Sequence, residues 1–143
     1  MKRILVTGAS GFVGSRFVER WKGEYTILAP RHGEMDITDV ASVERYCMEE
    51  VPDVVVHLAA ISNTGYCEEH PEESYRVNVE GACNMALASA RCGAKLVFFS
   101  SDQVYNGNRE SGLLTEDIAV HPENVYGRHK LEAEGRVLDI CPE

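Results

Sequence analysis

Short apolar runs alternate with amphipathic stretches along the chain. Four apolar runs are nearly continuous and rich in β-branched residues: RILVT (3–7), YTILA (25–29), DVVVHLAA (53–60) and KLVFFSS (95–101). Runs of this kind are typical of strands that are buried on both faces of a parallel sheet. We therefore expect four strands at these positions.

Between the strands, apolar residues recur at helical spacing. The recurring positions are Phe12, Val13, Phe17, Val18 and Trp21, then Val40, Val43 and Cys47, then Val77, Ala82, Met85 and Ala86. A last helix is expected over residues 124–138, and a long loop, functional or mobile, over residues 102–124. The alternation predicts right-handed βαβ units, and hence an α/β fold with a doubly wound parallel sheet in one domain, residues 1–143.

The run KLVFFSS is expected at an open edge of this sheet. It is the fourth strand in the doubly wound order 3-2-1-4-5-6, and no fifth apolar run follows it. Unpaired N–H and C=O groups on an apolar edge are a template for pairing with another chain. The sequence predicts self-association through residues 95–100, unless the last helix folds back over the edge.

Composition narrows the classes of function. With 44% hydrophobic residues among 143, the chain can bury a core, and its net charge of −9 argues against nucleic acid or an anionic membrane as a main partner. The five cysteines show no C-x-x-C pair and no metal-ligand spacing, which indicates neither a disulfide framework nor a metal site. No apolar segment is long enough for a signal peptide or a membrane span, so a reducing cytoplasm is the expected location.

Three glycines follow the first strand directly, in ILVTGASGFVG (4–14). After a strand, the first glycine permits a tight turn, the second allows a phosphate to approach the backbone, and the third lets the next helix pack closely. Gly8, Gly11 and Gly14 occupy these places. The N-terminus of the helix would then hold a pyrophosphate. The alternative is a glycine-rich turn that packs helix on strand without a ligand.

Several segments together resemble one superfamily. The glycine stretch, MDITD, HLAA, VNVEG, FFSSDQVY and NVYGRHK occur in this order and cover nearly the whole chain. They are similar to the extended branch of the short-chain dehydrogenase/reductases, which includes nucleotide-sugar reductases, epimerases and dehydratases. SSDQVYNGN and TEDIAVHPENVYGRHKLEAE look most like the dTDP-4-dehydrorhamnose reductases among them. The resemblance implies a Rossmann-type NAD(P)-binding domain and an amino-terminal part of a longer reductase.

Tyr126 and Lys130 are four residues apart and share one face of the last predicted helix. A phenol titrates near pH 10, and a neighbouring ammonium group would favour its phenolate. The resemblance implies that Tyr126 donates a proton, that Lys130 tunes it and holds the nicotinamide ribose, and that Ser101 polarises the substrate carbonyl. A core aromatic beside a solvated lysine, and a serine that only caps a turn, are the structural alternatives.

The end of the second strand bears on the choice of cofactor. An acid there would bind the ribose 2′-hydroxyl of NAD, but LAPRHG has no acid before Glu34 and offers Arg31 and His32. A 2′-phosphate suits these residues better, so NADP is expected and NAD is the alternative.

The resemblance extends the expected cofactor site to further residues. Asp36 and Ile37 would border the adenine, although Asp36 could instead cap a turn or helix. Asn78 matches a helix asparagine of the superfamily, for which a structural hydrogen bond is an equal alternative. The complete expected set is Thr7, Gly8, Ser10, Gly11, Phe12, Val13, Gly14, Arg31, Asp36, Ile37, Leu58, Ala59, Ala60, Asn78, Tyr126 and Lys130.

Three positions depart from the pattern of the rhamnose-type reductases. Gly65 replaces an aspartate, Gln103 a tyrosine, and His129 a serine or threonine, which leaves the identity of the sugar open. The expected function is NADP-dependent reduction of the keto group of a nucleotide-linked sugar, with the 143-residue chain alone inactive and a homo-oligomer left open. The alternatives are an epimerase or dehydratase with bound NAD, and a non-catalytic subunit such as the β subunit of methionine adenosyltransferase.

Overall fold

The structure is a computed structural model that describes residues 1–108 and 112–142. These residues form four strands and six α-helices, together with a short π-helix (Arg76–Glu80) and a 3-10 helix (Asp102–Tyr105). The strands are β1 (Arg3–Thr7), β2 (Thr26–Leu28), β3 (Val54–His57) and β4 (Lys95–Phe98). The α-helices are α1 (Phe12–Trp21), α2 (Val40–Glu50), α3 (Thr64–Glu69), α4 (Pro71–Tyr75), α5 (Gly81–Cys92) and α6 (Val125–Ile140).

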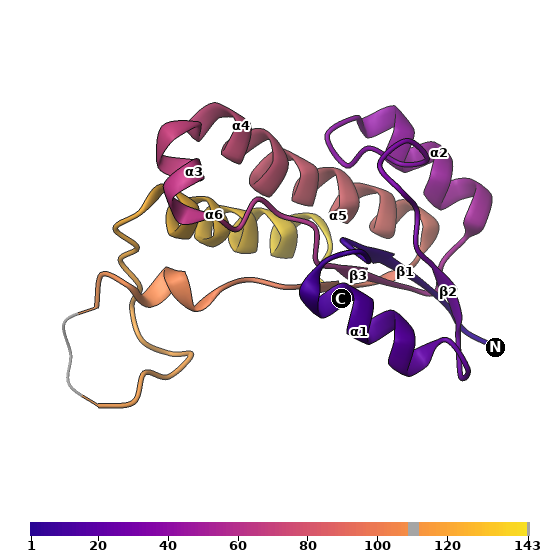
Figure 1. Ribbon diagram of the computed structural model, residues 1–143, viewed down its shortest axis with the longest axis horizontal. Helices are drawn as coiled ribbons and strands as arrows, with labels where there is room; N and C mark the ends of the chain where they lie inside the picture. Colours follow the sequence, from indigo (N-terminus) through magenta and orange to yellow (C-terminus); the bar gives the residue numbers. More distant parts are fainter. Residues whose placement is uncertain (109–111, 143) are drawn as a thin grey trace.

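All four strands are parallel and lie in the order β2-β1-β3-β4. Figure 1 shows α1 on one side of the sheet and α2, α5 and α6 on the other. This confirms the predicted α/β fold with a doubly wound parallel sheet. Because the strands are parallel, their carboxyl ends all lie at the same end of the sheet. Ligands of such folds bind at this end.

The strand order differs from the expected one. The order 3-2-1-4 would place the third run beyond β2, but β3 pairs with β1 on the opposite side, so that prediction is wrong. The segment between β2 and α2, residues 29–39, forms turns and no strand. After β2 the chain forms α2, crosses β1 and returns to the sheet as β3. Helix α2 packs against α5.

A core lies on each face of the sheet. On one face, Leu5 and Val55 pack with Val43, Cys47 and Met85 from α2 and α5. On the other face, the buried residues Ile4, Val6 and Val56 pack against Phe17 and Val18 of α1. Full burial of each such side chain contributes about 1.5–3 kcal/mol to folding. These two layers explain why the strand sequences are apolar throughout.

One face of β4 is covered and the other is open. On the covered face, Leu96 and Phe98 pack beneath Ala133 and Val137 of α6. On the open face, Val97 and Phe99 are 37% and 44% exposed, and β4 pairs with β3 alone among the described strands. The last helix therefore covers a face of β4 without pairing along its edge.

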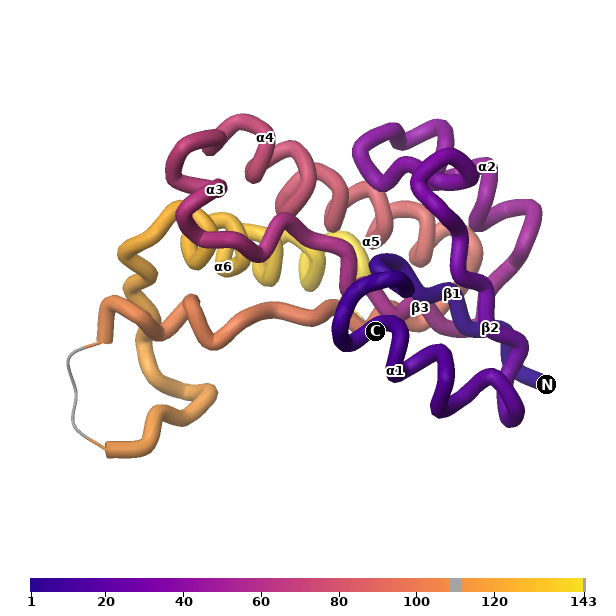
Figure 2. The backbone as a smooth tube through the Cα atoms, viewed as in Figure 1, coloured from indigo at the N-terminus to yellow at the C-terminus, as the bar shows by residue number. Residues whose placement is uncertain are grey.

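The long segment before α6 projects from the body of the molecule (Figure 2). It begins as the 3-10 helix and then runs irregularly to Asn124, which caps α6; residues 109–111 of the predicted loop lie outside the described residues. Two asparagines tie its two arms together: Asn106 Oδ1 accepts from Glu123 N at 2.7 Å, and Asn108 Nδ2 donates to Ala119 O at 2.9 Å. The base of the projection is thus cross-linked by hydrogen bonds.

Within the described part of the chain, no helix is both long enough and apolar enough to cross a bilayer. The same residues contain no cluster of His, Cys, Asp and Glu side chains that could hold a metal ion.

Candidate active site

The glycine turn after β1 is tightly packed. Gly8 has φ +69°, and a Cβ atom there would lie 2.9 Å from Ala59 N. A Cβ atom at Gly14 would lie 2.1 Å from Gly8 O, so neither position accepts a side chain without a shift of the backbone. The first and third glycines therefore do what their spacing predicts.

The N-terminus of α1 is open to a ligand. Gly11 is the N-cap and provides no side chain for the first N–H groups, while Phe12 and Val13 are 76% and 50% exposed. Unpaired N–H groups and the helix dipole favour an anion at such an end. The compact glycine turn and this uncapped helix fit the pyrophosphate of a dinucleotide.

Thr7 faces inward from the same turn and is 3% exposed. Its Oγ1 accepts hydrogen bonds from the N–H groups of Leu58 and Ala59, both at 3.1 Å, and lies 2.6 Å from Nδ1 of His57. Thr7 thus joins the end of β1 to the end of β3. Its hydroxyl group is engaged by protein atoms.

The residues expected near the adenine follow β2. The carboxylate of Asp36 accepts from the N–H of Thr38 at 2.9 Å and from its hydroxyl at 2.7 Å, and these bonds lower the pKa of Asp36. Arg31 and His32 are exposed beside it. Asp36 therefore has the turn-capping role that was its structural alternative.

Asn78 is buried at 2% exposure in the π-helix. Its Oδ1 accepts from Ile61 N at 2.8 Å, and its Nδ2 donates to Ile61 O at 2.9 Å. The amide therefore fixes the segment that follows β3 by two hydrogen bonds. This is the structural role that was the alternative for Asn78.

Ser101 and Tyr126 come together beyond the end of β4. Burial raises the pKa of Tyr126, and a hydrogen bond with the Ser101 side chain lowers it in part. Ser101 also caps the 3-10 helix by accepting from Gln103 N at 3.2 Å, as its structural alternative holds, and its role toward a substrate carbonyl stays a prediction. The prediction that Lys130 tunes Tyr126 stays a prediction.

Lys130 lies one helical turn after Tyr126 and is only 3% exposed. Its Nζ donates to Phe99 O at 2.6 Å and sits 4.2 Å from the centre of the Phe98 ring. Burial lowers its pKa to about 8, against an opposing effect of Glu134. The ammonium group is therefore directed at the end of β4.

The sequence profile of the family described as RmlD substrate binding domain matches residues 1–143. The chain belongs to this family.

Two relatives of this RmlD-family chain differ in kind. The dTDP-4-dehydrorhamnose reductase of Mycolicibacterium smegmatis is 34% identical over 143 residues, which are 99% of this chain and 43% of the relative. Methionine adenosyltransferase 2 subunit beta of Xenopus laevis is 33% identical over 145 residues, which are 96% of this chain and 43% of the relative.

A solved structure is similar to this chain in fold and in sequence. The dTDP-4-dehydrorhamnose reductase of Bacillus anthracis, in complex with NADP, is 34% identical with a TM-score of 0.92, over 99% of this chain and 51% of that chain. The RmlD-family chain therefore spans about half the length of the relatives it matches.

The departures from the rhamnose-type pattern are integrated into the fold. Gln103 Oε1 accepts from Asn124 Nδ2 at 2.8 Å, and His129 Nδ1 lies 2.8 Å from Ser74 Oγ. Gly65 is exposed in α3, where an added Cβ atom would meet only Asn63 Oδ1, at 3.4 Å. Gln103 and His129 therefore link the start of α6 to the 3-10 helix and to α4, whereas Gly65 makes no such link.

Sequence reasoning missed two residues that support the site. Glu68 accepts from Val125 N at 2.6 Å, next to Tyr126, and so caps the start of α6 together with Asn124. His57 lies beneath the site at the end of β3. An acid on a short helix and a histidine inside an apolar run carry no local signal for these contacts.

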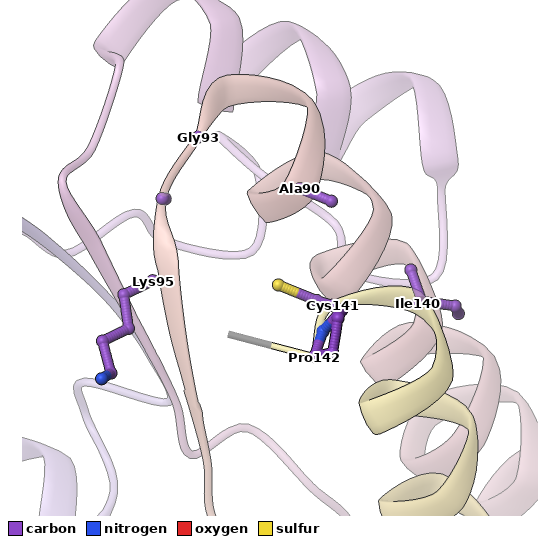
Figure 3. Close-up of a pocket in the computed structure, with 7 residues that line it drawn as sticks. Ala90, Gly93, Lys95, Ile140, Cys141 and Pro142 are labelled. Atoms are coloured by element: carbon purple, nitrogen blue, oxygen red, sulfur yellow. The ribbon is translucent and has the colours of Figure 1, made fainter.

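A surface hollow lies away from this site, at the start of β4 (Figure 3). It is lined by the end of α5 and the end of α6, through Ala90, Gly93, Ala94, Lys95, Ile140, Cys141 and Pro142. Ligands of open parallel sheets bind at the carboxyl ends of the strands, and this hollow is at the opposite end of β4. It is therefore no candidate for the dinucleotide.

Proposed function

We propose that this chain is the NADP-binding part of a reductase that acts on the keto group of a nucleotide-linked sugar. The observation that carries the proposal is the contact between Ser101 and Tyr126, with Lys130 one turn away, at the strand ends that also hold the glycine turn. The relatedness to dTDP-4-dehydrorhamnose reductases supports the choice of substrate class.

Each residue of the site has its own role in the proposed reduction. The glycine turn and Arg31 would hold NADPH, which when bound would supply a hydride to the carbonyl carbon. Tyr126 holds its proton at neutral pH, since burial raises its pKa, and donates it to the carbonyl oxygen. Ser101 donates a hydrogen bond that orients the same oxygen. Lys130 would hold the nicotinamide ribose, and Arg31 would bind the 2′-phosphate.

The choice of cofactor is tested by titrating the chain with NADPH and with NADH. We expect NADPH to bind more tightly, and Arg31→Asp to weaken NADPH by roughly ten- to a hundredfold, because one charge-assisted hydrogen bond contributes about 1.5–3 kcal/mol. Arg45→Asp, at an exposed position of α2, is the matched control and should leave the ratio unchanged. Equal or tighter binding of NADH contradicts the NADP assignment.

The reductase role is tested with Tyr126→Phe in the full-length protein. Loss of the acidic proton should lower kcat by roughly 10²–10⁴-fold and leave the affinity for NADPH nearly unchanged. Turnover within a factor of about three of wild type would show that Tyr126 is not the acid.

Two other functions compete with this one. An epimerase or dehydratase would hold NAD tightly through the catalytic cycle, so tight NAD binding by the wild-type chain favours it. A regulatory subunit is favoured by the 33% identity to methionine adenosyltransferase 2 subunit beta. Binding to a methionine adenosyltransferase without turnover of any nucleotide sugar would support that role.

A further inference from the structure

Three residues stand in one row across the sheet at its carboxyl edge. Thr7 of β1 is the register partner of His57 of β3, and His57 is the register partner of Phe98 of β4. Their side chains lie on the face that α6 covers, since Phe98 packs beneath that helix. The row therefore connects the glycine turn, which begins one residue after Thr7, with the helix that carries Lys130.

The hydrogen bonds of Thr7 determine the protonation of His57. A hydroxyl group has one proton and two acceptor lone pairs. Thr7 Oγ1 already accepts from two N–H groups, of Leu58 and Ala59, so its proton is the partner left for His57 Nδ1 at 2.6 Å. Nδ1 is then an acceptor, and the ring is neutral with its proton on Nε2.

The environment of His57 keeps it neutral. The side chain is 2% exposed, and burial, aided by the charge of Lys130, lowers its pKa to about 3. A protonated ring would lose Nδ1 as an acceptor for Thr7 and would add a second positive charge beside Lys130.

His57 supports the group that holds Lys130. The His57 and Phe98 rings stack with centroids 5.9 Å apart and planes 25° apart, and the Lys130 ammonium group lies over the Phe98 ring at 4.2 Å. The second contact of that ammonium group is Phe99 O, on the residue after Phe98. A cation over an aromatic face gains energy only while the ring stays beneath it.

We propose that His57 is a positioning residue for Lys130: kept neutral by Thr7, its ring fixes Phe98 beneath the ammonium group and so links the dinucleotide turn to the lysine. The importance of this link rests on the proposed function, in which Lys130 acts at the cofactor. The geometry itself does not depend on that function.

The test uses NMR of the complete 143-residue chain without any dinucleotide. Labelling lysine at Cε with ¹³C gives four signals, from Lys2, Lys22, Lys95 and Lys130. The Hε protons of Lys130 should lie upfield of the other three, because the Phe98 ring shields them. His57→Phe keeps a ring and should retain this displacement, whereas His57→Ala should remove at least half of it. An unchanged Lys130 signal in His57→Ala overturns the proposal.

A second measurement needs no change at His57. In ¹⁵N spectra of the wild-type chain at pH 6, His57 should be neutral with its proton on Nε2. Thr7→Val should abolish this fixed state, and Thr7→Ser, which retains the hydroxyl, should preserve it. A proton on Nδ1, or a cationic ring, in the wild-type chain contradicts the proposal even if His57→Ala does not fold.

A separate measurement would show that the proposed function is wrong. If Lys130→Met bound NADPH as tightly as the wild-type chain, the role of Lys130 at the cofactor would be wrong. The NMR results on His57 would be untouched by that outcome.

Discussion

Replacing Lys130 with methionine should stabilise the chain, because the fold buries a charge that water would solvate better. The pKa of Lys130 falls from 10.5 to about 8 on folding. At about 1.4 kcal/mol for each pH unit, keeping the group charged in the folded state costs about 3 kcal/mol. Methionine has a similar shape and needs no solvation. Because a pKa shift already includes the contacts that the ammonium group makes through its charge, the variant loses in addition only the hydrogen bond that an uncharged amine would keep with Phe99 O, about 0.5–1.5 kcal/mol.

We therefore expect Lys130→Met to be more stable by about 1.5–2.5 kcal/mol at pH 7, measured by urea unfolding. Each 1 kcal/mol corresponds to roughly 2–4 °C in Tm for a chain of this size. Lys22→Met is the control, because Lys22 is exposed and pairs with Glu19 only at the surface; it should change stability by no more than about 0.5 kcal/mol.

The pH dependence gives a second check with a definite sign. Since the folded pKa of Lys130 is the lower one, the unfolded chain binds more protons between pH 8 and 10.5, and wild-type stability gains from this group as the pH rises through that window. The advantage of Lys130→Met should therefore shrink toward pH 10. A variant that is less stable than wild type by more than about 1 kcal/mol at pH 7 would refute this reasoning.

Two further predictions concern the edges of the site. Glu68→Ala removes the carboxylate that caps α6 at Val125, so it should cost about 1–2 kcal/mol in urea unfolding, whereas Glu69→Ala, exposed on the same helix, should stay within about 0.5 kcal/mol. The chain should dimerise or aggregate through the open edge of β4, as seen by sedimentation over a concentration series. A monodisperse monomer whose Leu96 and Phe98 amides resist exchange would contradict the latter.

Periodicity was sufficient for the main elements and insufficient for their arrangement. The apolar runs predicted all four strands, helix spacing predicted α1, α2 and α5, and a last helix was expected over residues 124–138, where α6 lies. The position of β3 depends on whether residues 29–39 form a strand, which no local pattern decides. Helices α3 and α4 escaped notice because each has one buried residue, Cys67 and Ser74, and so shows no apolar repeat.

The candidate site, too, could be predicted from the sequence only in part. The glycine turn and the contact between Ser101 and Tyr126 follow from spacing and resemblance, and the structure brings these residues together. The direction of Lys130 could not be predicted, because its hydrogen bond goes to a backbone carbonyl that any residue at position 99 would present. His57 became visible only through strand register, which placed it beside Thr7 and Phe98.

A dinucleotide site at the carboxyl ends of the strands is the feature on which the proposed function depends. It is tested most directly by titrating the ¹⁵N-labelled chain with NADPH and mapping the amide signals that shift. The site predicts the largest changes in the glycine turn, residues 8–14, with further changes at Arg31, Ala59 and Ala60. No binding at millimolar NADPH, or changes confined to the hollow formed by the ends of α5 and α6, would contradict it.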